Sequence, residues 1–97
     1  MAQFTINQDS CVLSGRLSRE EVVALWTKRK SLLSSQVNQL DLSELNYIDS
    51  SGIAFLFHLV EQQKQNNLIL LLVNPSQQLQ SLIALYNLQP MFESQNS

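Results

Sequence analysis

Residues 40–59 constrain the fold more than any other part of this 97-residue chain. The stretch begins with Leu40-Asp41-Leu42-Ser43, whose alternation of apolar and polar residues is typical of a half-exposed strand. The polar corner Asp49-Ser50-Ser51-Gly52 follows, and beyond it apolar residues recur with helical spacing. Strand, corner and helix in this order place the corner at a helix N-terminus. The first backbone N–H groups of a helix lack partners within the helix, and the positive end of the helix dipole lies there.

The segment before residue 18 predicts a β-hairpin. Phe4 and Ile6 alternate with polar residues, a turn-forming stretch follows at residues 7–10, and a second short strand contains Cys11. We expect this second strand to end at Gly15, because glycine tolerates a bend or a positive φ. Cys11 has no cysteine partner in the chain and is expected to be a small buried hydrophobe.

A helix is predicted after Ser18, because Ser18 and Glu21 have the spacing of a capping box. The helix is expected to continue through Leu33, with one face formed by residues at helical spacing: Val22, Leu25, Trp26, Arg29, Leu32 and Leu33. Arg29 interrupts this apolar face, so either its aliphatic stem packs while its charge reaches solvent, or the face turns outward there. Trp26 has two interpretations, as an anchor in the core or as an exposed residue of an interface.

The helix after the corner carries apolar residues in two directions. One face is formed by Ile53, Leu56, Phe57 and Val60, whereas Phe55 and Leu59 point well away from it. A helix with two apolar faces needs two neighbours. We therefore expect Phe55 to point outward, toward a partner.

The rest of the chain predicts a further strand and a third helix. Residues 68–73 are apolar at every position, as in a central strand covered on both faces. Ser76 is a plausible N-cap for the helix that follows, in which Leu79, Leu82, Ile83 and Tyr86 have helical spacing. Residues 88–92 are a possible last strand, and residues 93–97 are expected to be a frayed tail.

This order predicts one α/β domain over residues 1–97. We expect a mixed sheet in which the N-terminal hairpin forms an antiparallel edge and the other strands are parallel, with three main helices. No leader peptide is apparent at the N-terminus, and the longest apolar run is six residues, 68–73. A membrane-spanning helix needs about 20. We expect a soluble, cytoplasmic protein.

Catalysis and metal binding are poorly supported by the composition. The chain has one histidine and one cysteine, and Ser51 precedes His58 by about two helical turns, too far for a direct hydrogen bond. No cluster of metal-ligand residues is present, and two glycines cannot form a phosphate-binding loop. We therefore expect no catalytic residues, no metal and no cofactor.

Charge is unevenly distributed, although the net charge is only −2. Five of the six basic residues lie before position 31: Arg16, Arg19, Lys28, Arg29 and Lys30. They form either a solvated face or a patch that meets an acidic partner. The overall balance gives no general attraction for nucleic acid or anionic lipid.

The corner itself has a structural and a functional interpretation. Asp49 or Ser50 is expected to be the N-cap of the helix, and a cap needs only one side-chain oxygen. Three oxygen-bearing side chains in a row exceed that need, and Gly52 leaves a first turn over which another protein could pass closely. A phosphoryl group on Ser50 would be favoured by the helix N-terminus and repelled by Asp49. Such a corner is suited to a protein contact that can be switched.

Three segments of the chain resemble STAS domains, the fold shared by anti-sigma-factor antagonists and anion-transporter tails. They are Leu13-Ser14-Gly15-Arg16-Leu17-Ser18, Leu40-Asp41-Leu42-Ser43 and Tyr47-Ile48-Asp49-Ser50-Ser51-Gly52-Ile53-Ala54-Phe55-Leu56. The resemblance implies a STAS-like fold over nearly the whole chain. In the antagonist branch the first serine of the corner accepts a phosphoryl group from a partner kinase, which by position is Ser50.

Three further segments, residues 24–29 around Trp26, residues 57–60 and residues 85–88, resemble the small STAS subunits of bacterial Mla phospholipid-transport systems. This resemblance implies a non-catalytic subunit that binds the transporter's ATPase and supports its assembly or activity. It also implies a location at the inner face of the inner membrane and a role in outer-membrane lipid asymmetry. The alternative is an anti-sigma-factor antagonist switched by phosphorylation of Ser50. The expected partner-binding residues are Trp26, Asp49, Ser50, Ser51, Gly52 and Phe55.

Overall fold

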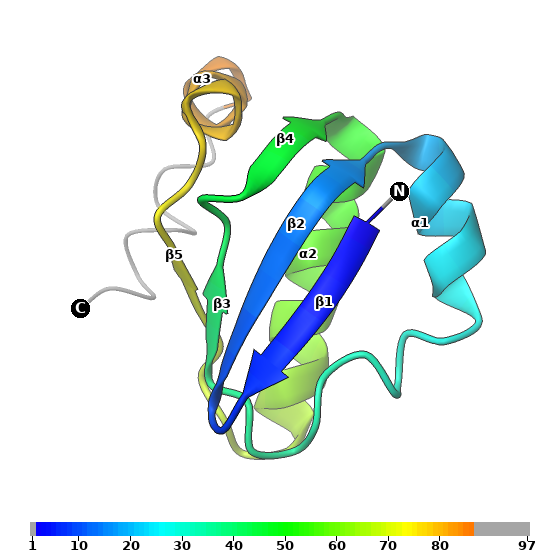
Figure 1. The fold of residues 1–97 in the computed structure, drawn as a ribbon, viewed down its shortest axis with the longest axis vertical. Helices are drawn as coiled ribbons and strands as arrows, with labels where there is room; N and C mark the ends of the chain where they lie inside the picture. Colours follow the sequence, from blue (N-terminus) through cyan, green and yellow to red (C-terminus); the bar gives the residue numbers. More distant parts are fainter. Residues whose placement is uncertain (1, 87–97) are drawn as a thin grey trace.

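The computed structural model describes residues 2–86 and has a mixed five-stranded sheet and three helices (Figure 1). The strands are β1 (Ala2–Asn7), β2 (Ser10–Leu17), β3 (Gln39–Asp41), β4 (Leu45–Ile48) and β5 (Leu71–Val73). The helices are α1 (Arg19–Trp26), α2 (Ser50–Gln65) and α3 (Gln77–Leu85). β1 is antiparallel to β2, and the other pairings are parallel, which confirms the predicted fold class.

The predicted hairpin is present, but its second strand is longer than expected. β1 and β2 pair from Ala2↔Gly15 to Asn7↔Ser10, and Gln8 in the turn has a φ of 59°. Gly15 was predicted to end this strand, and that prediction is wrong. Gly15 lies inside β2 with a φ of 93°. The register shifts between Gly15 and Arg16, so the glycine allows a local irregularity after which β2 continues to Leu17.

The strand predicted before the corner is in fact two strands, β3 and β4, which both pair with β2. β3 pairs with the first part of β2, and β4 pairs with the part beyond Gly15. Between them the chain leaves the ladder, and the Gly15 N–H donates to the Glu44 carbonyl at 3.2 Å. The sequence prediction missed this break. β4 is the strand that leads into the corner and α2 (Figure 1).

α1 begins as predicted but ends much earlier. The Glu21 carboxylate accepts from the Ser18 backbone N–H at 2.9 Å, and the Ser18 side chain accepts from the Glu21 backbone N–H, which together form the capping box. The Glu21 carboxylate also accepts from the Ser18 hydroxyl. The helix was expected to continue through Leu33 and instead ends at Trp26. The Trp26 carbonyl accepts from the Arg29 N–H and from the Arg29 guanidinium, so the next helical hydrogen bond is replaced by turns.

α2 lies across one face of the sheet, with α1 beside it (Figure 1). Leu56 and Leu59 of α2 are buried, as is Phe55, whose side chain is 2% exposed. The predicted outward orientation of Phe55 is therefore wrong. The second apolar direction of α2 is covered by the chain's own α1 and the turns after it. The buried apolar side chains are Cys11, Leu13, Leu17, Leu33, Val37, Leu40, Leu42, Leu45, Ile48, Ile53, Phe55, Leu56, Leu59, Leu70, Leu72, Leu79 and Ile83.

A buried amide ties the turns after α1 to α2. Gln63 is fully buried, and its side-chain N–H groups donate to the carbonyls of Ser34, at 3.0 Å, and Val37, at 2.6 Å. These bonds satisfy the polar end of a side chain that would otherwise be costly to bury. The chain between Trp26 and β3 is thereby fixed against α2.

β5 differs from the predicted central strand. Within residues 2–86 it pairs only with β3, so it is an edge strand, and Ile69 just before it is 71% exposed. Ser76 caps α3 as predicted, because its hydroxyl accepts from the Leu79 N–H at 3.2 Å. α3 lies beside β4 (Figure 1). The predicted strand at residues 88–92 and the tail at residues 93–97 lie outside the described residues.

Candidate functional site

The Asp49 carboxylate joins the beginnings of two helices. One oxygen, Oδ1, accepts from the Gly52 N–H in the first turn of α2 at 3.0 Å. The other, Oδ2, accepts from the Arg19 N–H at the start of α1, also at 3.0 Å. Asp49 is therefore the N-cap of α2, and Ser50 is the first residue of that helix. Neither N–H group has a partner within its own helix, and both lie at the positive end of a helix dipole, where a carboxylate is stabilising.

Gly52 allows α2 to approach the end of β2 closely. It is buried, and a Cβ atom at this position would lie 2.1 Å from the Leu17 carbonyl oxygen and 2.7 Å from Ile48 Cγ1. The surface that passes over the first turn of α2 is thus β2 of the same chain. The prediction that Gly52 leaves this turn bare for another protein is wrong, and the glycine instead fixes the position of the corner.

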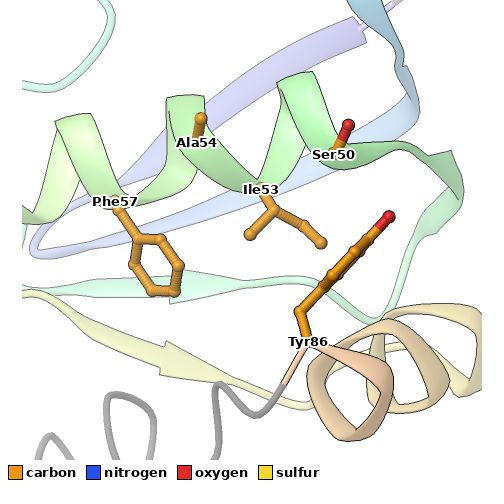
Figure 2. Close-up of a pocket in the computed structure, with 5 residues that line it drawn as sticks. All are labelled: Ser50, Ile53, Ala54, Phe57 and Tyr86. Atoms are coloured by element: carbon orange, nitrogen blue, oxygen red, sulfur yellow. The ribbon is translucent and has the colours of Figure 1, made fainter.

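Ser50 is exposed and borders an apolar groove. The groove has a volume of about 240 Å³ and is lined by Ser50, Ile53, Ala54, Phe57 and Tyr86. Figure 2 shows the Tyr86 ring directed from the end of α3 toward the first turns of α2. Tyr86 is 50% exposed, although its spacing suggested a core position. Ser51, the other serine of the corner, is half-buried.

Trp26 is anchored on one side and open on the other. Its side chain is 43% exposed, and its ring lies 4.8 Å from the His58 ring and 6.3 Å from the buried Phe55 ring, measured between centroids. The Arg29 guanidinium lies over the indole at 4.3 Å. The Trp26 ring is thus held in place on one side, as an anchor would be, and still presents apolar surface on the other; its role in an interface stays a prediction. Phe55, predicted as a residue that contacts a partner, is buried and packs against the inner side of the Trp26 ring.

These residues form one continuous surface along α2. Ser50, Ala54 and His58 follow one another at intervals of four residues, so they share a helix face. Trp26 contacts His58 on one side of this line, and the groove with Phe57 and Tyr86 lies on the other. We call this surface the docking face and define it by Trp26, Ser50, Ala54, Phe57, His58 and Tyr86.

The sequence analysis found Trp26 and Ser50 but missed the other members of the docking face. Ala54 and His58 could have been found, because each continues Ser50 by one further helical turn. Tyr86 could not, because its approach to α2 depends on the placement of α3. Asp49 and Gly52 belong to the corner as predicted, but their observed contacts are with the chain itself.

Two titratable groups of the described residues have pKa values far from their ordinary values. Glu21 has its pKa lowered to about 2, mainly by the hydrogen bond from the Ser18 hydroxyl and then by that from the Ser18 N–H. Burial raises the pKa of the Cys11 thiol to about 11, which keeps it protonated at neutral pH. Among residues 2–86 no group of three potential ligands could hold a metal ion. In the same range no helix is long and apolar enough to cross a membrane.

Comparison with known proteins gives a consistent picture. A family model described as "Mlab, STAS domain" matches residues 2–93. The intermembrane phospholipid transport system binding protein MlaB of Escherichia coli K12 is 30% identical over 80 residues, covering 82% of this chain and 81% of that protein. MlaB of Haemophilus influenzae is 33% identical over 81 residues, covering 78% and 77%.

Among solved structures, the chain is similar to the anti-sigma factor antagonist SpoIIAA. The unphosphorylated form has a TM-score of 0.61 and 18% identity, covering 87% of this chain and 82% of that protein. The phosphorylated form, from Bacillus, has a TM-score of 0.63 and 19% identity, covering 93% and 86%. At this identity the similarity concerns the fold.

Proposed function

The chain belongs to the STAS domain family, in the branch that contains MlaB, and we propose from this that it is an accessory subunit of a phospholipid-transporting ABC complex. In this proposal it binds the cytoplasmic ATPase at the inner face of the inner membrane and supports the assembly or activity of the transporter. In this proposal the subunit contributes to lipid transport, and so to outer-membrane lipid asymmetry, by binding the ATPase and not by catalysing a reaction.

The docking face is the observation that carries this proposal. Tryptophan is enriched at the energetic centres of protein interfaces, and here Trp26 keeps 43% of its surface exposed while its neighbours hold the ring. An anchored ring loses little conformational freedom on binding. Ser50 and Ala54 are small, so a helix of the partner can approach α2 closely between Trp26 and Tyr86.

The groove beside Ser50 supports the same proposal. Its lining is almost entirely apolar, and its volume of about 240 Å³ is large enough for one aliphatic or aromatic side chain of a partner. Burying such a side chain contributes roughly 1.5 to 3 kcal/mol before the cost of association. A tyrosine and a tryptophan at opposite borders give the contact two aromatic anchors.

Co-purification with the ATPase subunit of the Mla transporter from the same organism tests this proposal. Ser50→Arg and Ala54→Arg place a long charged side chain in the centre of the docking face, and each is expected to weaken binding at least about tenfold. Ile69→Arg is the matched control, because it adds the same charged side chain at an apolar residue that is 71% exposed just before β5 and lies outside the docking face. It should bind like the wild type.

Thermal unfolding separates loss of contact from loss of fold. Ser50 and Ala54 are exposed, so their variants should melt within a few degrees of the wild type. Wild-type co-purification by both arginine variants, in a folded state, would contradict the assignment of the docking face. Trp26→Ala is a weaker test, because it also uncovers Phe55.

The alternative function, an antagonist switched by phosphorylation, is favoured by the position of Ser50. Its hydroxyl is exposed at the first residue of α2, and Asp49 rather than Ser50 provides the N-cap. The hydroxyl is therefore available to accept a phosphoryl group. Intact mass measured after incubation with cell extract and ATP should show a stoichiometric adduct, absent in Ser50→Ala, if this alternative holds.

A further inference from the structure

A second groove lies beside Trp26, on the side of α2 away from Tyr86. It has a volume of about 140 Å³ and is lined by Arg29, Lys30, His58, Glu61, Gln62 and Gln65. The first two residues follow α1, and the other four lie on α2. His58 belongs both to this groove and to the docking face, so the two surfaces are continuous.

Arg29 is held rigidly at this groove. Its Nη1 donates to the Trp26 carbonyl at 2.7 Å, and its guanidinium lies 4.3 Å from the centre of the Trp26 ring. The Arg29 carbonyl in turn accepts from the side chain of Gln62 at 3.1 Å. A guanidinium has five N–H donors and the bond to Trp26 uses one, so most of its capacity remains for a ligand. Little entropy is lost when a side chain already fixed in place binds an anion.

The local charge is positive. Residues 22–40 contain Lys28, Arg29 and Lys30 and no aspartate or glutamate. Lys28 and Lys30 are exposed. Within the groove, Glu61 is the one carboxylate against Arg29 and Lys30. A chain with a net charge of −2 thus presents a cationic corner, defined as Arg29 and Lys30 beside His58, next to its exposed tryptophan.

We propose that the cationic corner receives an acidic side chain of the ATPase when that protein covers the docking face. This inference rests on the proposed function and specifies the partner chemistry: an apolar contact on Trp26 bordered by an aspartate or glutamate. The planar guanidinium of Arg29 suits a carboxylate, and Lys30 adds a second positive charge. Trp26 fixes the position of the apolar contact relative to the charged one, because the same ring packs against His58 and Arg29.

Two neutralising substitutions of opposite sign test this proposal without large changes in shape. Lys30→Gln removes an attractive charge and should weaken the affinity for the Mla ATPase about threefold at low salt. Glu61→Gln removes a repulsive charge and should strengthen it about twofold. Binding is measured kinetically with the full chain and the purified ATPase, and the changes should appear largely in the association rate.

Arg16→Gln is the matched control. It also removes one positive charge, but Arg16 stands over the Tyr47 ring, on the face of the sheet away from α2. Its affinity should equal that of the wild type. Raising the salt from about 50 to about 300 mM should weaken wild-type binding and reduce the difference between the wild type and Lys30→Gln.

The outcomes separate this inference from the function on which it rests. If the wild type does not bind the ATPase, the proposed function fails and the inference with it. If Ser50→Arg abolishes binding while Lys30→Gln and Glu61→Gln both match the wild type, or shift the affinity in the same direction, only the cationic corner is wrongly assigned. The assignment is also overturned if Lys30→Gln leaves ATPase binding unchanged but abolishes co-sedimentation with vesicles of phosphatidylglycerol.

Discussion

Replacing Asp49 with alanine should destabilise two helices at once. Its carboxylate accepts from the Gly52 N–H and from the Arg19 N–H, each at 3.0 Å. A lost N-cap costs about 1 kcal/mol, and the second, more exposed bond should cost a little less. Together they predict a loss of roughly 2 kcal/mol in the free energy of unfolding. For a domain of this size that lowers Tm by about 8 to 16 °C.

Asp49→Asn separates the two contributions. The asparagine oxygen can still accept from Gly52, whereas its amide NH₂ cannot accept from the Arg19 N–H. We expect about half the loss seen with alanine. Urea unfolding followed by circular dichroism measures both variants. Ser76→Ala, which removes the single hydrogen bond that caps α3, calibrates the cost of one cap.

The reasoning is refuted if Asp49→Ala costs no more than Ser76→Ala. That result would mean that the bond to Arg19 contributes nothing and that α1 and α2 are not coupled through Asp49. An alanine variant with an unchanged midpoint but a lower m-value would instead indicate a change in the denatured state.

Three further predictions concern the frame of the site. Gly52→Ala should lower the free energy of unfolding by at least about 2 kcal/mol, because the new Cβ atom would overlap the Leu17 carbonyl. This loss is expected despite the higher helix propensity of alanine. A variant that urea unfolding shows to be more stable than the wild type would mean that α2 can move away from Leu17. Glu21 has its pKa lowered to about 2, so its stabilising effect is present above its ordinary value of 4.5 and is lost as the pH falls toward 2. The Tm difference between the wild type and Glu21→Gln should therefore shrink as the pH falls below 4.5 and be largely lost near pH 2, and a constant difference contradicts this. The buried Cys11, with a pKa near 11, should react with a thiol reagent at pH 8 only as fast as the chain opens, so labelling that is independent of urea argues against burial.

Features encoded by neighbouring residues were predictable from the sequence. The capping box of Ser18 and Glu21, the cap at Ser76 and the corner at Asp49 each depend on residues within one helical turn, and all are present. The hairpin is also local, since its strands are joined by two residues. The corner was therefore placed correctly at the start of a helix.

Features that depend on distant segments were not predictable in the same way. The turns that replace the second half of the predicted helix are bound by α2: the Gln62 side chain donates to the Arg29 carbonyl, and the Gln63 side chain donates to the carbonyls of Ser34 and Val37. The burial of Phe55 depends on α1 packing beside α2, and a single helix pattern cannot show whether its second face meets a neighbour or solvent. The apolar run at residues 68–73 could not reveal that β5 pairs on one side only within the described sheet.

β2 also has a consequence for synthesis on the ribosome. It pairs with β1, β3 and β4, and Leu13 and Leu17 on its inner face are buried with residues of α2. Those two leucines emerge before the helix that covers them, which ends at Gln65. At about 5 to 20 residues per second, the apolar side of the nascent hairpin waits roughly 2 to 10 seconds for its cover. During that interval it is a natural substrate for chaperones that bind exposed apolar chain.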